Sequence, residues 1–432
     1  MFCRGNSCNG ARIYPREFTT ADGGIILQTL LANMRTLCDE MHTLTGITVA
    51  YGTKEKSESA LYGRAQEIAL EKGAFIPCIR PLEEDSLYDL ASLSKLMTAV
   101  MTMRLVEMGN LTLDECIGSI DKRFTQLADV SVFDVLSFRA ALKTPGRIDE
   151  TDSREEALSR LFAVARGELP AVRVYSDINA MVIKYVIEAK LDMPFAQALH
   201  RFLFSPTGMG DTYAAVPESE KHRCVCYNYE HRIAGDAYTL RTDTPLGAPH
   251  DPKALALSMG GRDLCGHAGL FSTRQDMVRF AQALLGGELI SRESLQKIAQ
   301  NYTGRDNGDG TWRQYLGFQC FTKHPYQHLS EVPEWMQENS IGLSGFTGNH
   351  LSIDPVKERF VLFLGNRCHG RVSNIIPPKG ETFARYGVGE DGVGFVRWMD
   401  GRSVPSSAKY VYFKDKMLHT PIAQRMEQLG WL

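Results

Sequence analysis

Ser92 and Lys95 are the residues whose types and spacing best suit catalysis. A serine hydroxyl is a weak nucleophile unless a base takes its proton, and residues three apart share a helix face, so Lys95 would lie over Ser92. The residues around them are mostly apolar, which predicts a buried helix. Because burial disfavours the ammonium form, we expect a neutral Lys95 that acts as the general base. By itself the spacing fits equally well a helix-capping serine beside a lysine that extends to the surface.

The elements that would position this pair follow from the spacing of apolar residues and from the turn signals between them. The helix that carries the pair should end at Gly109 and Asn110, where a helix stop signal stands. A turn at Asp354 and Pro355 joins two runs that predict a β-hairpin. The predicted helices cover 24–42, 92–108, 153–165, 179–189, 274–285 and 420–429, and the predicted strands cover 46–51, 60–63, 349–353 and 359–364.

Strands and helices at both ends of the chain, with helices between them, predict an α+β fold. It would consist of an antiparallel sheet flanked by N- and C-terminal helices, with an inserted mostly helical domain. The sheet domain would be discontinuous, formed by residues 24–95 and 290–432, and the helical domain would cover 96–289. Residues 371–415, rich in Gly, Pro and Ser, are expected to form an extra excursion. The active site would lie between the two domains.

Composition narrows the class of protein. The 432 residues carry a formal net charge of −3, which gives no basic surface for nucleic acid. The N-terminus does not read as a signal peptide and no stretch is long enough to span a bilayer, so we expect a cytoplasmic protein without membrane insertion. Ten scattered cysteines fit a reducing compartment. They form no zinc-type pair, and no nucleotide or metal motif is present, so we expect no cofactor and no metal.

Several ordered stretches carry a resemblance to a known family. They are LYDLASLSKLMTAVMTMRLVEMGNLTL around Ser92, then VYSDINAMVIKYVIE, SPTGMGDTYAAVP, GAPHDPKALALSMGGRDLCGHAGLFST and GLSGFTGNHLSIDPVKERFVLFLGNR. Together they resemble the penicillin-binding-protein and class C β-lactamase-like serine hydrolases, whose nucleophile stands in an SxxK motif. That family includes D-Ala-D-Ala peptidases, D-aminopeptidases, family VIII esterases and acyltransferases. The resemblance covers roughly residues 40–370 and implies a β-lactamase/transpeptidase-like fold.

The second motif of the family, Tyr-x-Asn or Tyr-x-Asp, is matched by Tyr175-Ser176-Asp177. The resemblance implies that Tyr175 relays a proton between the nucleophile and the leaving group. A phenol beside an amine or ammonium group can serve in this way because the charge favours its phenolate. The alternative is a tyrosine packed at the start of a helix that Ser176 or Asp177 caps.

The third motif departs from the family pattern. Where the family has Lys or His, then Thr or Ser, then Gly, this chain has Leu343-Ser344-Gly345. Gly345 would let the substrate approach the strand, and the N–H of Phe346, with that of Ser92, could form the oxyanion hole.

Leucine, however, cannot bind a substrate carboxylate. His267 is the nearest candidate to replace the missing cation, against the alternative of a structural histidine that orders a loop, and His350 is a weaker one. We interpret His250-Asp251 as structural.

These residues predict a serine hydrolase that forms an acyl-enzyme at Ser92, with Lys95 and Tyr175 moving protons. The substrate would be a small-molecule or peptide ester or amide, and the missing cation favours a neutral one over a β-lactam or D-Ala-D-Ala. The alternatives are an acyltransferase or cyclase that uses the same acyl-enzyme, and a catalytically impaired homologue that binds or senses penicillin-like ligands. The oligomeric state does not follow from the sequence.

Overall fold

The computed structural model describes residues 24–258 and 263–432. The N-terminal stretch on which the expectation about a signal peptide rests, together with Cys3 and Cys8, lies outside the described residues. Among the described residues, none of the helices is long and apolar enough to cross a membrane. Buried free thiols are found at Cys38, Cys224, Cys226, Cys265, Cys320 and Cys368.

A seven-stranded sheet forms the centre of the structure and draws on both ends of the chain. Its neighbouring strands pair antiparallel, so that Val49, for example, lies opposite Ala60 on one side and Phe363 on the other. The strands, in spatial order, are β12 (Phe321–Thr322), β13 (Ile341–Gly345), β14 (Asn349–Asp354), β15 (Arg359–Gly365), β1 (Gly46–Thr53), β2 (Ser57–Glu71) and β3 (Ala74–Pro81).

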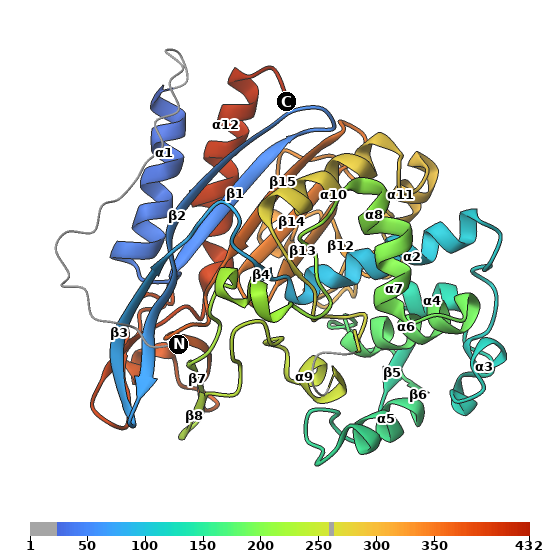
Figure 1. The fold of residues 1–432 in the computed structure, drawn as a ribbon, viewed down its shortest axis with the longest axis horizontal. Coiled ribbons are helices and arrows are strands. Elements are labelled where there is room, and N and C mark those ends of the chain that lie inside the picture. Colours follow the sequence, from blue (N-terminus) through green and yellow to red (C-terminus); the bar gives the residue numbers. More distant parts are fainter. Residues whose placement is uncertain (1–23, 259–262) are drawn as a thin grey trace.

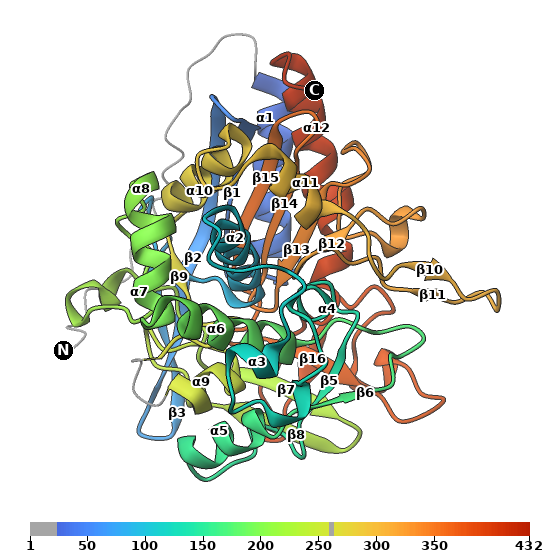
Figure 2. The same cartoon turned by 90° about the vertical axis from the view of Figure 1, so that its right-hand side faces the viewer.

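Helices cover both faces of this sheet (Figures 1 and 2). On one face, α1 (Gly24–Arg35) and α12 (Thr420–Gln428) come from opposite ends of the chain and contact each other. On the other face, α10 (Arg274–Gly286) contacts β1 and β15, while α11 (Arg292–Ala299) contacts α2 (Ser94–Glu107). The predicted α+β fold, an antiparallel sheet between helices, is confirmed.

Two apolar cores follow from this layering. β15 is buried along its whole length, and its side chains alternate between the cores: Leu362 joins the core that contains α2, and Phe363 joins the core beneath α1 and α12. A strand covered on both faces needs apolar residues at every position, which explains why its sequence, RFVLFLG, shows a continuous apolar run rather than an alternation.

The remaining helices and short strands lie in the sequence between β3 and β12 or after β15. The helices are α3 (Ile117–Ile120), α4 (Val132–Leu136), α5 (Arg154–Phe162), α6 (Asp177–Leu191), α7 (Phe195–Leu199), α8 (Ser205–Thr207) and α9 (Pro252–Ser258). The short strands pair as β4 (Tyr88–Asp89) with β9 (Phe271–Ser272), β5 (Ala141–Lys143) with β6 (Ala165–Gly167), β10 (Arg305–Asp306) with β11 (Trp312–Arg313), and β17 (Phe395–Arg397) with β18 (Ser403–Pro405).

The excursion expected over 371–415 forms structure of its own. Its strand β16 (Val372–Ile376) pairs in parallel with β7 (Glu230–Ala234), which in turn pairs with β8 (Ala237–Arg241). The segment then turns back toward the central sheet through Asp415–His419, a single wide helical turn that leads directly into α12. This return places Lys414 against strand β13.

Candidate active site

Ser92 stands on a strained turn. A short 3-10 turn, Ala91–Leu93, precedes α2 and leaves Ser92 half-buried. Ala91 has a φ of 47°, in the left-handed region that residues with a Cβ rarely adopt. The carboxylate of Asp89 holds the turn, because it accepts hydrogen bonds from the N–H groups of Ala91 (2.9 Å) and His250 (2.6 Å). Backbone strain that the surroundings hold in place is typical of functional positions.

Lys95 lies one turn further on and is fully buried. Its Nζ donates to Ser92 Oγ at 3.0 Å and to the backbone oxygen of His267 at 3.2 Å, and it pairs with Asp177 Oδ1 at 2.7 Å. Burial alone would lower the pKa of Lys95, but Asp177 and Tyr175 raise it above its ordinary value. The expectation of a neutral Lys95 is therefore wrong, since the carboxylate of Asp177 outweighs the desolvation on which that expectation rested.

Tyr175 lies two residues before the start of α6 and faces the same lysine. Lys95 Nζ is 5.0 Å from the centroid of the tyrosine ring, and the phenol is within hydrogen-bonding reach of Lys95 and Ser92. Burial raises the pKa of Tyr175, although the nearby Lys95 ammonium opposes that rise. The ring is held by contacts with the aromatic rings of Phe138 and Phe321. The second motif and the SxxK pair thus meet at one point.

Asp177 is available to the lysine because its neighbour caps the helix. Ser176 is the N-cap of α6, and its Oγ accepts a hydrogen bond from the N–H of Ile178. The Asp177 carboxylate instead bonds two lysines, Lys95 through Oδ1 and Lys253 through Oδ2 at 3.1 Å. The pKa of Asp177 falls well below its ordinary value, because these charges and His267 outweigh its burial.

Lys253 extends the charged network in a way that the sequence analysis missed. Its Nζ lies 3.6 Å from Asp251 Oδ2, and Asp251 Oδ1 lies 2.9 Å from His267 Nε2. His267 therefore belongs to the Lys95 side of the site, through both its ring and its backbone, and does not take the place of the missing third-motif cation. The signal that could have found Lys253 is its position two residues after the His250-Asp251 dipeptide.

The third motif forms the other wall of the site. A Cβ placed on Gly345 would lie 2.8 Å from the oxygen of Leu90 and 3.4 Å from Ala91 Cβ, so β13 contacts the residues that precede Ser92. This contact brings the N–H of Phe346 to the same edge as Ser92. Leu343 is fully buried in the core that contains α2. It reaches neither substrate nor solvent.

Ser344 points to the opposite face of β13, where it meets a cation that the sequence analysis missed. Lys414 Nζ lies 3.0 Å from Ser344 Oγ, pairs closely with Glu331, and lies 3.3 Å from His350 Nδ1. Ser344 Oγ also lies 2.7 Å from Glu331 Oε2 and 3.0 Å from His350 Nδ1. His350 is buried, which together with the nearby Lys414 lowers its pKa well below the ordinary value, so it is a neutral acceptor.

Among the described residues, two groups of side chains bring possible metal-ligand atoms close together. Ligand atoms of Asp177, Asp251 and His267 lie within 4.8 Å of one another, as do those of Glu230, His250 and Cys368. Protein cations already neutralise both groups: Lys253 contacts the first, and Arg232 (2.9 Å) and Arg241 (3.3 Å) contact Glu230 in the second. A metal ion would have to displace these partners, so neither group offers a ready site.

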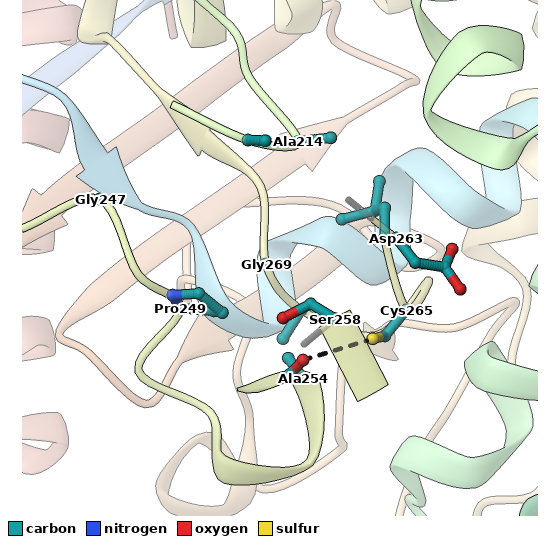
Figure 3. Close-up of a pocket in the computed structure, with 11 residues that line it drawn as sticks. Ala214, Gly247, Pro249, Ala254, Ser258, Asp263, Cys265 and Gly269 are labelled. Atoms are coloured by element: carbon teal, nitrogen blue, oxygen red, sulfur yellow. Dashed lines mark hydrogen bonds between the residues drawn. The ribbon is translucent and has the colours of Figure 1, made fainter. Parts of the chain in front are cut away.

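A small cavity lies beside the loop that carries Cys265 and Gly269 (Figure 3). It encloses about 20 Å³, which is room for a water-sized molecule and too little for an acyl substrate. Its wall includes Cys265, whose Sγ contacts the backbone oxygen of Ala254 at 3.7 Å, and also Pro249, Ser258, Asp263 and Gly269. Nearer the nucleophile, Ser92 and Tyr175 are half-buried and Phe346 is exposed.

Comparison with known proteins identifies the family to which this chain belongs. The family profile described as Beta-lactamase matches residues 37–376, which is more than half of the chain. The chain belongs to the beta-lactamase family. The resemblance drawn from the ordered motifs is thus confirmed, and with it the class of serine hydrolases to which those motifs pointed.

Curated relatives of this beta-lactamase-family chain carry the name of a carboxypeptidase. Putative D-alanyl-D-alanine carboxypeptidases of Salmonella paratyphi B and Salmonella typhimurium are 25% identical over 327 residues, which covers 67% of this chain and 71% of theirs.

Solved structures share the fold. A simvastatin synthase (LovD) mutant from Aspergillus terreus has a TM-score of 0.59 at 14% identity and covers 79% of this chain and 91% of its own. The beta-lactamase/D-alanine carboxypeptidase from Pseudomonas syringae has 0.59 at 18%, with 79% and 94% covered, and EstCE1, a hydrolase with promiscuous acyltransferase activity, has 0.60 at 17%, with 79% and 93% covered.

Proposed function

We propose that this chain is a serine hydrolase that forms an acyl-enzyme at Ser92 and cleaves an ester or amide of a small-molecule or peptide substrate. The observation that carries the proposal is the contact of Ser92 Oγ with Lys95 Nζ at 3.0 Å, beside Tyr175 and on a strained turn. A nucleophile in contact with two groups that can exchange protons is the arrangement that acyl transfer requires.

Lys95 and Tyr175 act as one acid–base pair. Asp177 keeps Lys95 protonated and burial keeps Tyr175 protonated near neutral pH, so the pair must lose one proton before it can accept another. Ser92 Oγ then bonds to the carbonyl carbon while its proton passes to the pair. When the bond to the leaving group breaks, the pair returns that proton to it, and water releases the acyl group by the same steps in reverse order.

The negative charge on the carbonyl oxygen is stabilised by the backbone N–H groups of Ser92 and Phe346. Such donors are effective because they are fixed in place before the charge develops. Gly345 supports this role, since its lack of a side chain lets β13 lie against Leu90 and Ala91. The buried Leu343 supports a neutral substrate over D-alanyl-D-alanine, although the curated relatives carry the name of a carboxypeptidase.

Acyl transfer to an alcohol or amine is the second candidate. Phe346, whose N–H would serve the oxyanion hole, is 39% exposed while its ring stacks on His250, and an exposed aromatic residue at this point suits an acceptor molecule with an apolar part. One neighbour in fold, EstCE1, is described as a hydrolase with promiscuous acyltransferase activity. The same acyl-enzyme at Ser92 serves both candidates.

Covalent labelling tests the proposal. A fluorophosphonate or a fluorescent penicillin should label the wild type and leave Ser92→Ala unlabelled, and mass spectrometry should place the adduct on Ser92. Ser94→Ala, two residues further on at the first position of α2, should be labelled like the wild type. Equal labelling of wild type and Ser92→Ala would refute the nucleophile. Labelling without turnover of p-nitrophenyl esters, with or without an added alcohol, would instead indicate a binding or sensing protein.

A further inference from the structure

Two guanidinium groups contact the ring of Phe346, the residue whose N–H would serve the oxyanion hole. Cζ of Arg367 lies 4.9 Å from the centroid of that ring, and Cζ of Arg232 lies 5.2 Å from it. Arg232 belongs to β7, and Arg367 follows the end of β15 by two residues. Both contacts are within cation–π distance. The fold thus brings two positive charges from separate segments to a residue that is 39% exposed.

One carboxylate near this ring is shared between two arginines. Glu230 Oε2 lies 2.9 Å from Arg232 and 3.3 Å from Arg241, and it also contacts His250 at 2.9 Å. Arg241 has a second partner in Asp243, at 3.1 Å. These two carboxylates offset the charges of Arg232 and Arg241 and leave none over for a third guanidinium.

Arg367 is that third guanidinium. It donates to the backbone oxygen of Ser373, which is a neutral acceptor. The Nε atoms of Arg367 and Arg232 are buried and have no hydrogen-bond partner among the described residues. Both side chains still reach the surface, because Arg367 is half-buried and the side chain of Arg232 is 32% exposed. An anionic group that reaches Phe346 therefore meets a net positive charge.

The backbone fixes Phe346 beside the nucleophile. A Cβ on Gly345, the residue before it, would lie 2.8 Å from the backbone oxygen of Leu90. Thr347, the residue after it, donates from Oγ1 at 3.0 Å to the oxygen of the residue that precedes Leu90. Both neighbours of Phe346 are therefore held against the segment that leads into Ser92.

The ring of Phe346 borders the charged network of the site. It stacks on the imidazole of His250, with the ring centroids 5.6 Å apart. The next residue, Asp251, lies 3.6 Å from Nζ of Lys253, the lysine that contacts Asp177. The side chains of this network are between 21% and 25% exposed. The exposed part of Phe346 thus adjoins the partly exposed groups that surround the catalytic lysine.

Tyr175 and the two arginines lie at opposite ends of β13. The Tyr175 ring stacks on that of Phe321 at 5.2 Å, and Phe321 pairs with Gly342 near the start of the strand. Phe346 follows the last residue of the strand. The leaving group takes its proton from the acid–base pair that includes Tyr175, so it points toward the start of β13. The acyl part of the substrate then extends toward Phe346.

We propose that Arg232 and Arg367, with the ring of Phe346 between them and the nucleophile, form a subsite for a carboxylate on the acyl part of the substrate. This inference rests on the proposed acyl-enzyme function of Ser92 and names its substrate class, an ester or amide with an anionic acyl part and a neutral leaving group. The buried Leu343 supports the neutral leaving group. Guanidinium groups bind carboxylates through charge-assisted hydrogen bonds, and an aromatic ring packs against the methylene chain that carries the carboxylate.

A matched pair of esters tests the subsite. Both release 4-nitrophenolate, and their acyl part is an adipoyl chain that ends in a free carboxylate or in a carboxamide. The measured quantity is the ratio of kcat/KM for the carboxylate ester to that for the carboxamide ester. A second pair, with one neutral acyl group and thioglycolate or thioglycolamide as leaving group, places the same carboxylate on the other side of the acyl carbon.

We expect the wild-type ratio for the acyl pair to exceed about tenfold, because a charge-assisted hydrogen bond contributes about one decade in kcat/KM. Arg232→Gln and Arg367→Gln should each lower the ratio by roughly fivefold or more, and Arg232→Lys, which keeps the charge, should lower it less. The wild-type ratio should also fall as NaCl is raised from about 0.02 to about 0.5 M.

Arg292→Gln is the matched control. Arg292 is exposed and contacts the turn that follows β14, at the opposite end of that strand from the residue that pairs with Gly345. Its substitution removes the same charge and should leave the ratio unchanged. The leaving-group pair should show no preference for the carboxylate in the wild type.

The outcomes separate the proposed function from the subsite. If the labelling of Ser92 fails, the proposed function is refuted and the subsite with it. If Ser92 is labelled but the wild type cleaves neither adipoyl ester, or cleaves both within about twofold, the subsite alone is refuted. Unchanged ratios in Arg232→Gln and Arg367→Gln refute it as well, as does a carboxylate preference confined to the leaving-group pair. Should Arg367→Gln lose its thermal transition, Arg232→Gln and the salt dependence decide the question.

Discussion

Replacing Asp177 with Asn should move the acidic limb of the pH–kcat/KM profile to lower pH. The limb reports the loss of one proton from the Lys95–Tyr175 pair, and the negative charge of Asp177 favours the protonated form of that pair. At the 2.7 Å between Lys95 Nζ and Asp177 Oδ1, the Coulomb attraction is about 1.5 kcal/mol in water and about 6 kcal/mol at an effective dielectric constant of 20. Even the lower figure corresponds to about one pH unit.

Lys253→Met should move the same limb in the opposite direction. Lys253 neutralises part of the Asp177 charge through Oδ2. Without Lys253, the full negative charge of Asp177 should act on Lys95 and raise the pKa of the Lys95–Tyr175 pair. The shift should be smaller, because Lys253 acts through Asp177 and its side chain is 23% exposed. A loss of activity in both variants without a shift would indicate a structural effect.

The assay follows the hydrolysis of an activated ester from pH 5 to 10, with Asp192→Asn as the matched control. Asp192 caps the other end of α6 in a left-handed conformation that Asn also tolerates. Its substitution changes the same charge on the same helix without a contact to Lys95, so its profile should match the wild type. Shifts of the same sign in Asp177→Asn and Lys253→Met would refute the reasoning.

Four further variants, at three positions, test the residues that support the site. Gly345→Ala should fold yet lose roughly 100-fold in kcat/KM, because its Cβ would lie 2.8 Å from the oxygen of Leu90 and push β13 away from Ser92. Leu343→Ala should lower the free energy of unfolding in urea by about 2–5 kcal/mol, and Leu343→Lys should destabilise the fold further rather than create a carboxylate site, because the position is fully buried. Burial alone would lower the pKa of His250, but Cys368 and Glu230 raise it to about 10. The stability contributed by this charge is present below about pH 6.5 and lost as the pH rises through about 10, so the Tm of the wild type should fall over that range more steeply than that of His250→Asn.

The fold could be predicted where local pattern and burial agree. The helix that begins at Ser94 and the hairpin of β14 and β15 follow from their sequences, because their apolar periodicity matches what the core demands. Strand β3 was missed because its sequence, AFIPCIRP, carries two prolines. Proline is compatible with an edge strand, and β3 is the edge of the sheet, but only the sheet order reveals that edge.

The residue types of the candidate site could be predicted from the sequence, but the protonation state of Lys95 and the additional lysines could not. Motif order identified Ser92, Lys95 and Tyr175, and the structure brings these three together. The protonation state of Lys95 could not follow from its own helix, because the compensating carboxylate comes from the start of α6. Lys253 contacts Asp177 and Lys414 contacts Ser344 only because the fold brings distant parts of the sequence together. Neither lysine belongs to a motif with a recognisable residue spacing.

The position of Lys414 explains how this chain can lack a third-motif cation and still keep a cation at the strand. Side chains alternate along β13, so residue 343 faces the core with Leu351 beside it, and residue 344 faces the layer of α12. A lysine at 343 would replace a fully buried leucine in that apolar core. A lysine that arrives from the C-terminal segment reaches Ser344 on the other face and brings Glu331 as its counterion. Glu331 neutralises the charge of Lys414, so the cation that this strand keeps is engaged by groups of the protein on the face of β13 opposite to Leu343.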